Sequence, residues 1–124
     1  MIQRFIELGE GYSDIYELME LGKSNPHRIK QMLALHTTIN EKKYVSIAIV
    51  LQPAKEGKFM PIYICREGIP IDSQRYQLFR SLSEEVNKKL ISFEIKPSSA
   101  FSEKELYYQY LLGILRLHHI LPSL

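Results

Sequence analysis

The sequence has no tryptophan, a single cysteine among its 124 residues and no long apolar run. Because Cys65 has no second cysteine to pair with, an intrachain disulfide is excluded and a reducing compartment is favoured. No apolar stretch approaches the roughly 20 residues that a membrane-spanning helix needs. The Met1–Leu8 segment is too short and, with Arg4 and Glu7, too charged for a secretion signal. We therefore expect a cytoplasmic protein.

An excess of charge of either sign is also missing. Lysine and arginine total 16, and aspartate and glutamate total 14. The sequence pI of 8.6 lies below the value of about 9 that is typical of nucleic-acid-binding domains, so we expect neither nucleic acid nor a membrane as a partner. Hydrophobic residues make up 45% of the chain, which is enough for a folded core. The length fits one domain covering residues 1–124.

The stretch that organises the predicted fold is Tyr44–Leu51, which is almost wholly apolar and rich in β-branched side chains. Such a run is too short for an ordinary helix and is typical of a strand covered on both faces. Neighbouring side chains such as Tyr44 and Val45 would point to opposite faces. We predict that this strand lies at the centre of a sheet and that the rest of the chain packs against it.

Apolar periodicity and turn residues divide the rest of the chain into elements. We predict further strands at Ile2–Leu8, Arg28–Thr38, Phe59–Arg66 and Ile91–Lys96. We predict helices from Asp14 to Gly22, from Asp72 or Ser73 to about Leu90, and from Ser102 to about His119. In the second strand, alternation places Ile29, Leu33 and Leu35 on one face. The predicted fold class is α+β, a single domain ordered β-α-β-β-β-α-β-α with three helices packed on a five-stranded antiparallel or mixed sheet.

The last predicted helix has the clearest local signature. Ser102 and Glu105 have the spacing of a capping box, and Phe101 can pack on Leu106 as a hydrophobic staple. Apart from one narrow polar line, the surface of this helix is apolar almost all round. Such a helix must be buried on most sides, either in a core or at a subunit interface. We predict a homodimer whose interface includes four of its residues: Tyr107, Tyr108, Leu112 and Leu115.

The Gly9-Glu10-Gly11 turn between a predicted strand and helix supports a second hypothesis. Glycines at such a place can let backbone amides approach an anion. The turn lacks the third glycine of a dinucleotide fingerprint and the Lys-Ser/Thr pair of a P-loop, and Glu10 would repel phosphate. A simple turn that needs a positive φ is the interpretation that we favour for these glycines. The open alternative is a small-ligand or phosphate-binding protein, or an enzyme, that uses Gly9, Glu10, Gly11, Arg66 and Glu67.

Metal ligands and catalytic nucleophiles have no clear pattern. The histidines at positions 27, 36, 118 and 119 and the lone cysteine are scattered without the spacing of a metal site. Cys65 beside Arg66 could be an activated thiol, but no histidine is near it in the sequence, and a small buried cysteine is the simpler interpretation. We predict no metal site, no cofactor and no catalytic residue, and we favour a protein that is not an enzyme.

The order helix, three strands, helix and strand, counted from Asp14, resembles the core of restriction-endonuclease-like nucleases. In that family a carboxylate on the second core strand and a Glu-x-Lys on the third strand hold Mg²⁺. Here the corresponding strands, Tyr44–Leu51 and Phe59–Arg66, have neither group, and Glu94-Ile95-Lys96 lies on the strand after the second helix. The resemblance therefore implies a degenerate fold of this type without nuclease activity.

Three segments also resemble a small family of uncharacterised proteins from Gram-positive spore-forming bacteria. These segments are Ile2–Tyr12, Tyr63–Pro70 and Ser102–Leu117. The resemblance implies a bacterial protein with no assigned activity, so it gives no catalytic residue. We predict a non-enzymatic interaction or regulatory module that forms a homodimer through its last helix, with any further protein partner unidentified.

Overall fold

The computed structural model of the protein describes residues 2–8, 12–53, 57 and 59–121, with the backbone alone at residues 12–14. The elements in chain order are β1 (Ile2–Glu7), α1 (Tyr12–Ser24), β2 (Ile29–Ile39), β3 (Lys42–Leu51), β4 (Phe59–Pro70), α2 (Gln74–Glu85), β5 (Leu90–Glu94) and α3 (Lys104–Leu117). Two short 3-10 helices, Pro26–Arg28 and Ser98–Ala100, precede β2 and α3. The predicted α+β fold with the order β-α-β-β-β-α-β-α is confirmed.

The five strands form one sheet in the order β1-β4-β3-β2-β5. The central strand is β3, as predicted for Tyr44–Leu51, and it runs antiparallel to both of its neighbours, β2 and β4. The outer pairs are parallel, β1 with β4 and β5 with β2, so the sheet is mixed. Four strands therefore run in one direction, and their carboxyl ends point to the same end of the sheet.

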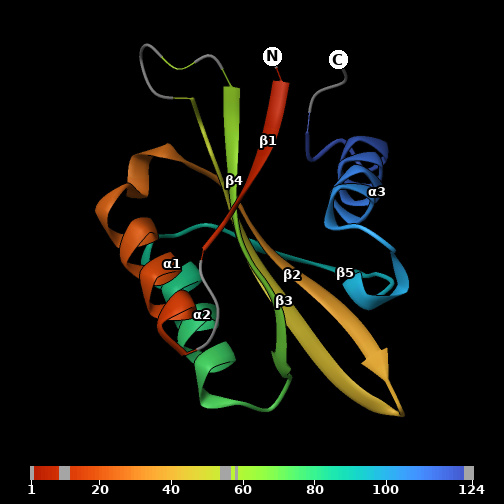
Figure 1. Cartoon of the computed structure of the whole chain (residues 1–124). Coiled ribbons are helices and arrows are strands. Elements are labelled where there is room, and N and C mark those ends of the chain that lie inside the picture. Colours follow the sequence, from red (N-terminus) through yellow and green to blue (C-terminus); the bar gives the residue numbers. More distant parts are fainter. Residues whose placement is uncertain (1, 9–11, 54–56, 58, 122–124) are drawn as a thin grey trace.

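Helices cover both faces of the sheet, with α1 and α2 together on one face and α3 on the other (Figure 1). The side chains of β3 alternate between the two cores, as expected for a strand buried on both faces. Ile47 and Ile49 belong to the core beneath α1 and α2, whereas Ala48 and Val50 belong to the core beneath α3. The sheet thus separates α3 from the other two helices.

A bulge in β2 changes which face one of its residues occupies. The register with β3 shifts between Ile29 and Gln31. Ile29 consequently packs with Met32 in the core beneath α1 and α2, whereas Leu33 and Leu35 face α3. The predicted placement of Ile29 on the same face as these two leucines was wrong, because simple alternation fails across an inserted residue.

The second helix is shorter than predicted. Its last residue is Glu85, and Asn87 follows with a left-handed φ of 57°. The backbone N–H of Lys88 donates to the carbonyl of Ser83 at 2.9 Å, which closes the helix end. Leu90, predicted as the last helical residue, instead begins β5.

The predicted capping box and staple at the start of α3 do not form. Glu103 is the N-cap, and its side chain makes no capping hydrogen bond. Phe101 packs on the rings of Tyr107 and Tyr110, with centroid distances of 5.7 and 5.2 Å, and Leu106 is exposed. Because the helix has its N-cap at Glu103 rather than at Ser102, the predicted spacing of cap and staple no longer applies, and Phe101 packs on the two aromatic rings instead. No helix in the described part of the chain is long and apolar enough to span a membrane.

Candidate functional site

The side chains of β1 that point toward α3 make specific contacts with side chains of that helix. Gln3 Oε1 accepts hydrogen bonds from Nε and Nη2 of Arg116, at 3.2 and 2.6 Å. Phe5 stacks on Tyr108, with ring centroids 4.5 Å apart and an interplanar angle of 12°. Glu7 accepts a hydrogen bond from the Tyr108 hydroxyl. The start of β1 contacts the end of α3, and the end of β1 contacts the first turns of α3, so the helix runs antiparallel to the strand.

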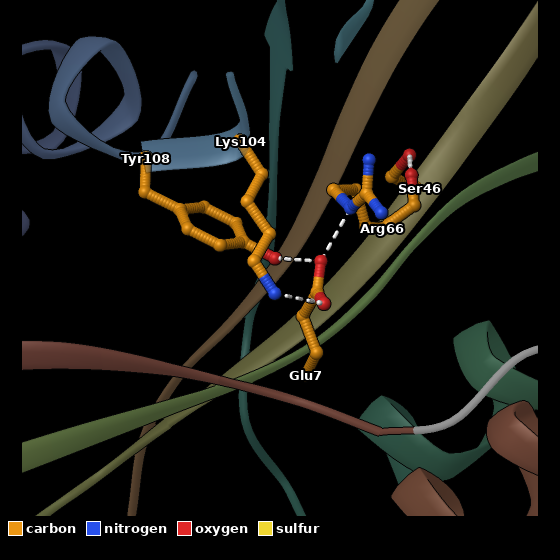
Figure 2. A network of polar contacts seen from close by, with 5 residues as sticks. All are labelled: Glu7, Ser46, Arg66, Lys104 and Tyr108. Atoms are coloured by element: carbon orange, nitrogen blue, oxygen red, sulfur yellow. Dashed lines mark hydrogen bonds and ion pairs between the residues drawn. The ribbon is translucent and has the colours of Figure 1, made fainter. Parts of the chain in front are cut away.

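Four polar residues from three elements meet at the carboxyl end of β1 (Figure 2). Glu7 Oε1 accepts from Nε of Arg66 on β4 and from the hydroxyl of Tyr108 on α3. Nζ of Lys104, one helical turn before Tyr108, lies 3.4 Å from Glu7 Oε2. The Glu7 side chain is 26% exposed. We call these four residues the Glu7 cluster.

An irregularity in β4 places Arg66 in this cluster. Between two flanking cross-strand pairs, β3 has the single residue Ser46, whereas β4 has the three residues 66–68. The Ser46 hydroxyl donates to the Arg66 carbonyl at 2.8 Å and holds the extra residues against β3 (Figure 2). A Cβ on Gly68 would lie 3.1 Å from the Cβ of Tyr44, so a side chain there would require Tyr44 to shift by a few tenths of an ångström. Bulges commonly redirect a side chain in this way, and β4 continues beyond the predicted end at Arg66.

Electrostatics keep Glu7 ionised and Tyr108 neutral. Partial burial acts to raise the pKa of Glu7, but the hydrogen bonds from Tyr108 and Arg66, with the charges of Arg66 and Lys104, outweigh burial and lower it. Burial, together with the hydrogen bond to Glu7, raises the pKa of Tyr108. A carboxylate with a lowered pKa and three donors around it is a poor proton acceptor. The cluster is therefore suited to holding α3 against β1 and β4.

A groove of about 400 Å³ lies beside the Glu7 cluster, between β1 and α3. Phe5 and Leu112 contribute apolar surface to it, and Arg4, Lys104 and Glu105 contribute charge. The groove is open along the edge of the sheet, because β1 is the terminal strand in the strand order. Glu7, Lys104 and Tyr108 also line the groove, and these three already bind one another in the Glu7 cluster.

The structure places the predicted ligand residues as follows. Gly9, Glu10 and Gly11 lie outside the described residues. Arg66 belongs to the Glu7 cluster, and its neighbour Glu67 is exposed. In the part of the chain that the structure describes, no three histidine, cysteine, aspartate or glutamate residues gather as a metal site.

The four residues predicted at a dimer interface occupy different environments. Tyr107 and Leu115 are each 1% exposed and pack in the core beneath α3, so the protein's own sheet covers them. Tyr108 belongs to the Glu7 cluster, and Leu112 lines the neighbouring groove. The prediction did not include Glu7 or Lys104. The signal available for them was the alternation of Gln3, Phe5 and Glu7 on one face of a strand, with Lys104 and Tyr108 four residues apart on a helix.

A family model described as a domain of unknown function, DUF7147, matches residues 1–121. The chain belongs to this family. The match covers every strand and helix, so both helical layers and the Glu7 cluster lie within the DUF7147 domain. Comparison with curated proteins and with solved structures gave no match. The predicted membership of an uncharacterised family is confirmed to this extent.

Alkaline pH is expected to weaken the DUF7147 fold through α3. Burial raises the pKa of Tyr107 to about 12, against about 10 in an unfolded chain. Because the pKa is raised by folding, stability is intact below the unfolded value and falls as the pH rises above it. We expect the free energy of unfolding to decline above about pH 10, and to decline less in Tyr107→Phe. Urea unfolding followed by circular dichroism at several pH values measures both slopes, and equal slopes would contradict the expectation.

Proposed function

We propose that this protein is a non-enzymatic interaction module that forms a homodimer through the outer face of α3. The observation that supports the proposal is a row of four residues along one flank of α3: Leu106, Tyr110, Gly113 and Leu117. Gly113 and the two leucines are exposed, whereas Tyr110 is half-buried, with its ring against Phe101 and its hydroxyl accepting a hydrogen bond from the backbone N–H of Lys96. We call this row the outer stripe. Leu106 is 43% exposed and Leu117 is 75% exposed. Two leucines this exposed on one short helix give apolar surface that association would cover.

The spacing of the outer stripe is that of a helix–helix contact. Its members follow one another at intervals of 4, 3 and 4 residues, the spacing of a coiled-coil seam. At 100° per residue, they lie between about 100° and 160° around the helix from Leu111, the middle of the buried row Tyr107, Leu111 and Leu115. The helix thus has one apolar side inside the protein and a second one outside it.

A symmetric antiparallel pairing of two α3 helices would match large side chains to small ones. Homodimers commonly have twofold symmetry, in which one surface contacts its own copy. If the axis passes near the middle of the outer stripe, Leu106 meets Leu117 of the partner subunit. Tyr110 then meets Gly113 of the partner subunit, so a ring packs against bare backbone. Two such ring-on-glycine contacts would form in each dimer.

The glycine in the outer stripe has no explanation inside the subunit. Glycine within a helix costs about 1 kcal/mol relative to alanine. A Cβ added to Gly113 would have nothing within 4 Å, so no close contact in the chain requires its absence. Close approach of a second helix would require a residue without a Cβ at this position, and this requirement supports the homodimer.

The polar contacts of α3 support a role for this helix in presenting the outer stripe to a second subunit. The Glu7 cluster holds the first turns of the helix, and the Gln3–Arg116 hydrogen bonds hold its end. Both ends of the outer stripe are therefore fixed relative to the sheet. A preorganised surface of this kind loses less freedom on association than a mobile one.

Replacing Leu117 with glutamate is expected to dissociate the dimer without unfolding the subunit. The two-fold arrangement would bury two unpaired carboxylates, so we expect the dissociation constant to rise by about 100-fold or more. Because Leu117 is 75% exposed in the subunit, the melting temperature of the monomer should change little. Light scattering coupled to size exclusion at micromolar concentrations measures the mass. Leu78→Glu, at an exposed leucine of α2, is the matched control and should remain dimeric. A wild-type protein that is monomeric throughout this range would refute the proposal.

Replacing Gly113 with alanine is expected to act in opposite directions on folding and association. The better helix former should raise the stability of the monomer by about 0.5–1 kcal/mol. The added methyl group would meet the Tyr110 ring of the partner subunit and weaken the dimer, and Gly113→Gln would weaken it further. Urea unfolding of dilute protein and sedimentation velocity of concentrated protein separate the two effects. Unchanged or stronger association in both variants would rule out close helix approach at Gly113.

A further inference from the structure

A cleft between α2, β5 and the end of β2 lies on the other side of the sheet from α3. It consists of two adjoining hollows, of about 250 and 420 Å³. The hollows share His36, Ile71 and Ser92 in their lining, so they lie side by side. The first hollow extends toward Lys43 on β3, and the second extends along α2 toward Arg80. We call this space the His36 cleft.

The position of the His36 cleft in the fold is one where α/β proteins bind ligands. β2, β4 and β5 run in the same direction. His36 lies in the second half of β2, Ile71 directly follows β4, and Ser92 lies in the middle of β5. The cleft thus opens toward the carboxyl ends of these strands, and crevices there are the usual ligand sites of open α/β sheets.

Unpaired charges line both hollows. Lys43 and Glu94 line the first, Arg80 and Glu84 line the second, and all four residues are exposed. Among the residues that the structure describes, none of these four side chains forms an ion pair or a hydrogen bond, and neither does the imidazole of His36. The Glu7 cluster is the opposite case, because its charged groups bind one another. The His36 cleft therefore presents donors and acceptors that are available to a ligand.

The side chains of His36 and Arg80 both contact the buried ring of Tyr76. Tyr76 is 6% exposed. The imidazole of His36 meets its ring edge-on, with centroids 6.1 Å apart and an angle of 88°. The guanidinium carbon of Arg80 lies 5.8 Å from the centre of the same ring. A guanidinium over a ring keeps its N–H groups in a planar fork suited to a carboxylate or phosphate.

We propose that the His36 cleft binds a small organic anion that also carries hydroxyl or amino groups. The anionic group would lie between His36 and Arg80, with Lys43 adding attraction from the other hollow. The carboxylates of Glu84 and Glu94 would accept hydrogen bonds from hydroxyl or amino groups on the same molecule. A bare anion would meet these two carboxylates without offering them donors, so it should bind more weakly than an anion with hydroxyl groups.

Isothermal titration with three probes at constant ionic strength tests the proposal. Citrate and glycerol 3-phosphate carry both an oxyanion and hydroxyl groups, one as a carboxylate and the other as a phosphate, and inorganic phosphate is the bare anion. We expect saturable binding of citrate or glycerol 3-phosphate, and the stronger of the two identifies the preferred anionic group. We expect inorganic phosphate to bind at least about tenfold more weakly than that probe.

Variants of the full chain assign the binding to the cleft. Arg80→Gln and Lys43→Gln should each weaken binding of the preferred probe by about tenfold or more, because the first removes a charge-assisted hydrogen bond and the second removes the attraction of a nearby positive charge. Lys42→Gln is the matched control, since Lys42 is the neighbour of Lys43 on β3 and points to the opposite face. Leu117→Glu should bind normally, so the outcome is independent of dimer formation. The proposal is overturned if neither organic probe binds saturably, if inorganic phosphate binds equally well, or if Lys42→Gln weakens binding as much as Lys43→Gln.

Discussion

Replacing Tyr107 with alanine is expected to lower the free energy of unfolding by about 3–5 kcal/mol, the usual cost of emptying a buried aromatic site. Tyr107 is 1% exposed, and its ring packs in the core beneath α3 beside Phe101. The loss should be concentrated in the attachment of α3. Urea unfolding followed by circular dichroism measures it, because the chain has no tryptophan for fluorescence.

The neighbouring residue provides a control for this substitution. Leu106→Ala changes a side chain that is 43% exposed on the outer stripe, so the stability of the monomer should fall by no more than about 0.5 kcal/mol. Measurements at concentrations below the dimer range separate folding from association. A similar loss in Tyr107→Ala and Leu106→Ala would mean that α3 is not seated on the sheet as described.

Replacing Glu7 with alanine is expected to cost about 2 kcal/mol of folding stability. The substitution removes the acceptor for Arg66 and Tyr108 and the ion-pair partner of Lys104. Loss of one partner from a fully buried ion pair costs about 3–5 kcal/mol, and the 26% exposure of the Glu7 side chain lets water replace part of what is lost. Thermal and urea unfolding at neutral pH measure the change.

A matched acid and a second substitution distinguish the cluster from general charge effects. Glu105→Ala removes an exposed carboxylate from the same groove and should change stability by less than about 0.5 kcal/mol. In a double-mutant cycle, Glu7→Ala and Tyr108→Phe should be non-additive by about 1 kcal/mol, because they share one hydrogen bond. Additive effects, or equal losses in the two alanine variants, would argue against the cluster as the anchor of α3.

The central strand and the order of elements were predictable because they depend on local patterns. The apolar run Tyr44–Leu51 needs both faces covered, and β3 has helices on both. Period-two and helical periodicity likewise predicted the five strands and the three α-helices, but not the two short 3-10 helices. Periodicity does not reveal an inserted residue. The prediction therefore put Ile29 on the wrong face of β2 and ended the fourth strand at Arg66, although β4 continues to Pro70. Periodicity also does not reveal the left-handed Asn87 that stops α2.

The Glu7 cluster and the His36 cleft were not predictable for a different reason. Glu7 is hydrogen-bonded to Arg66, which is 59 positions away in the sequence, and to Tyr108, which is 101 positions away. Their meeting depends on the strand order and on the side of the sheet that α3 occupies, and neither follows from spacing in one sequence. Tyr108 was selected for its apolar ring at a dimer surface, whereas its hydroxyl is an internal donor. The same limit applies to His36, which is an isolated histidine in the sequence.

The parallel outer pairs affect the order in which the chain can assemble during synthesis. β2, β3 and β4 are consecutive and antiparallel, so they can pair as soon as they have been made. β1 is synthesised first, but Ile2 pairs with Phe59, and the nascent first strand must wait for a much later segment. Contacts between distant segments form slowly. The outward-facing Arg4 on β1 would discourage premature pairing of this waiting strand with another ribosome-bound copy.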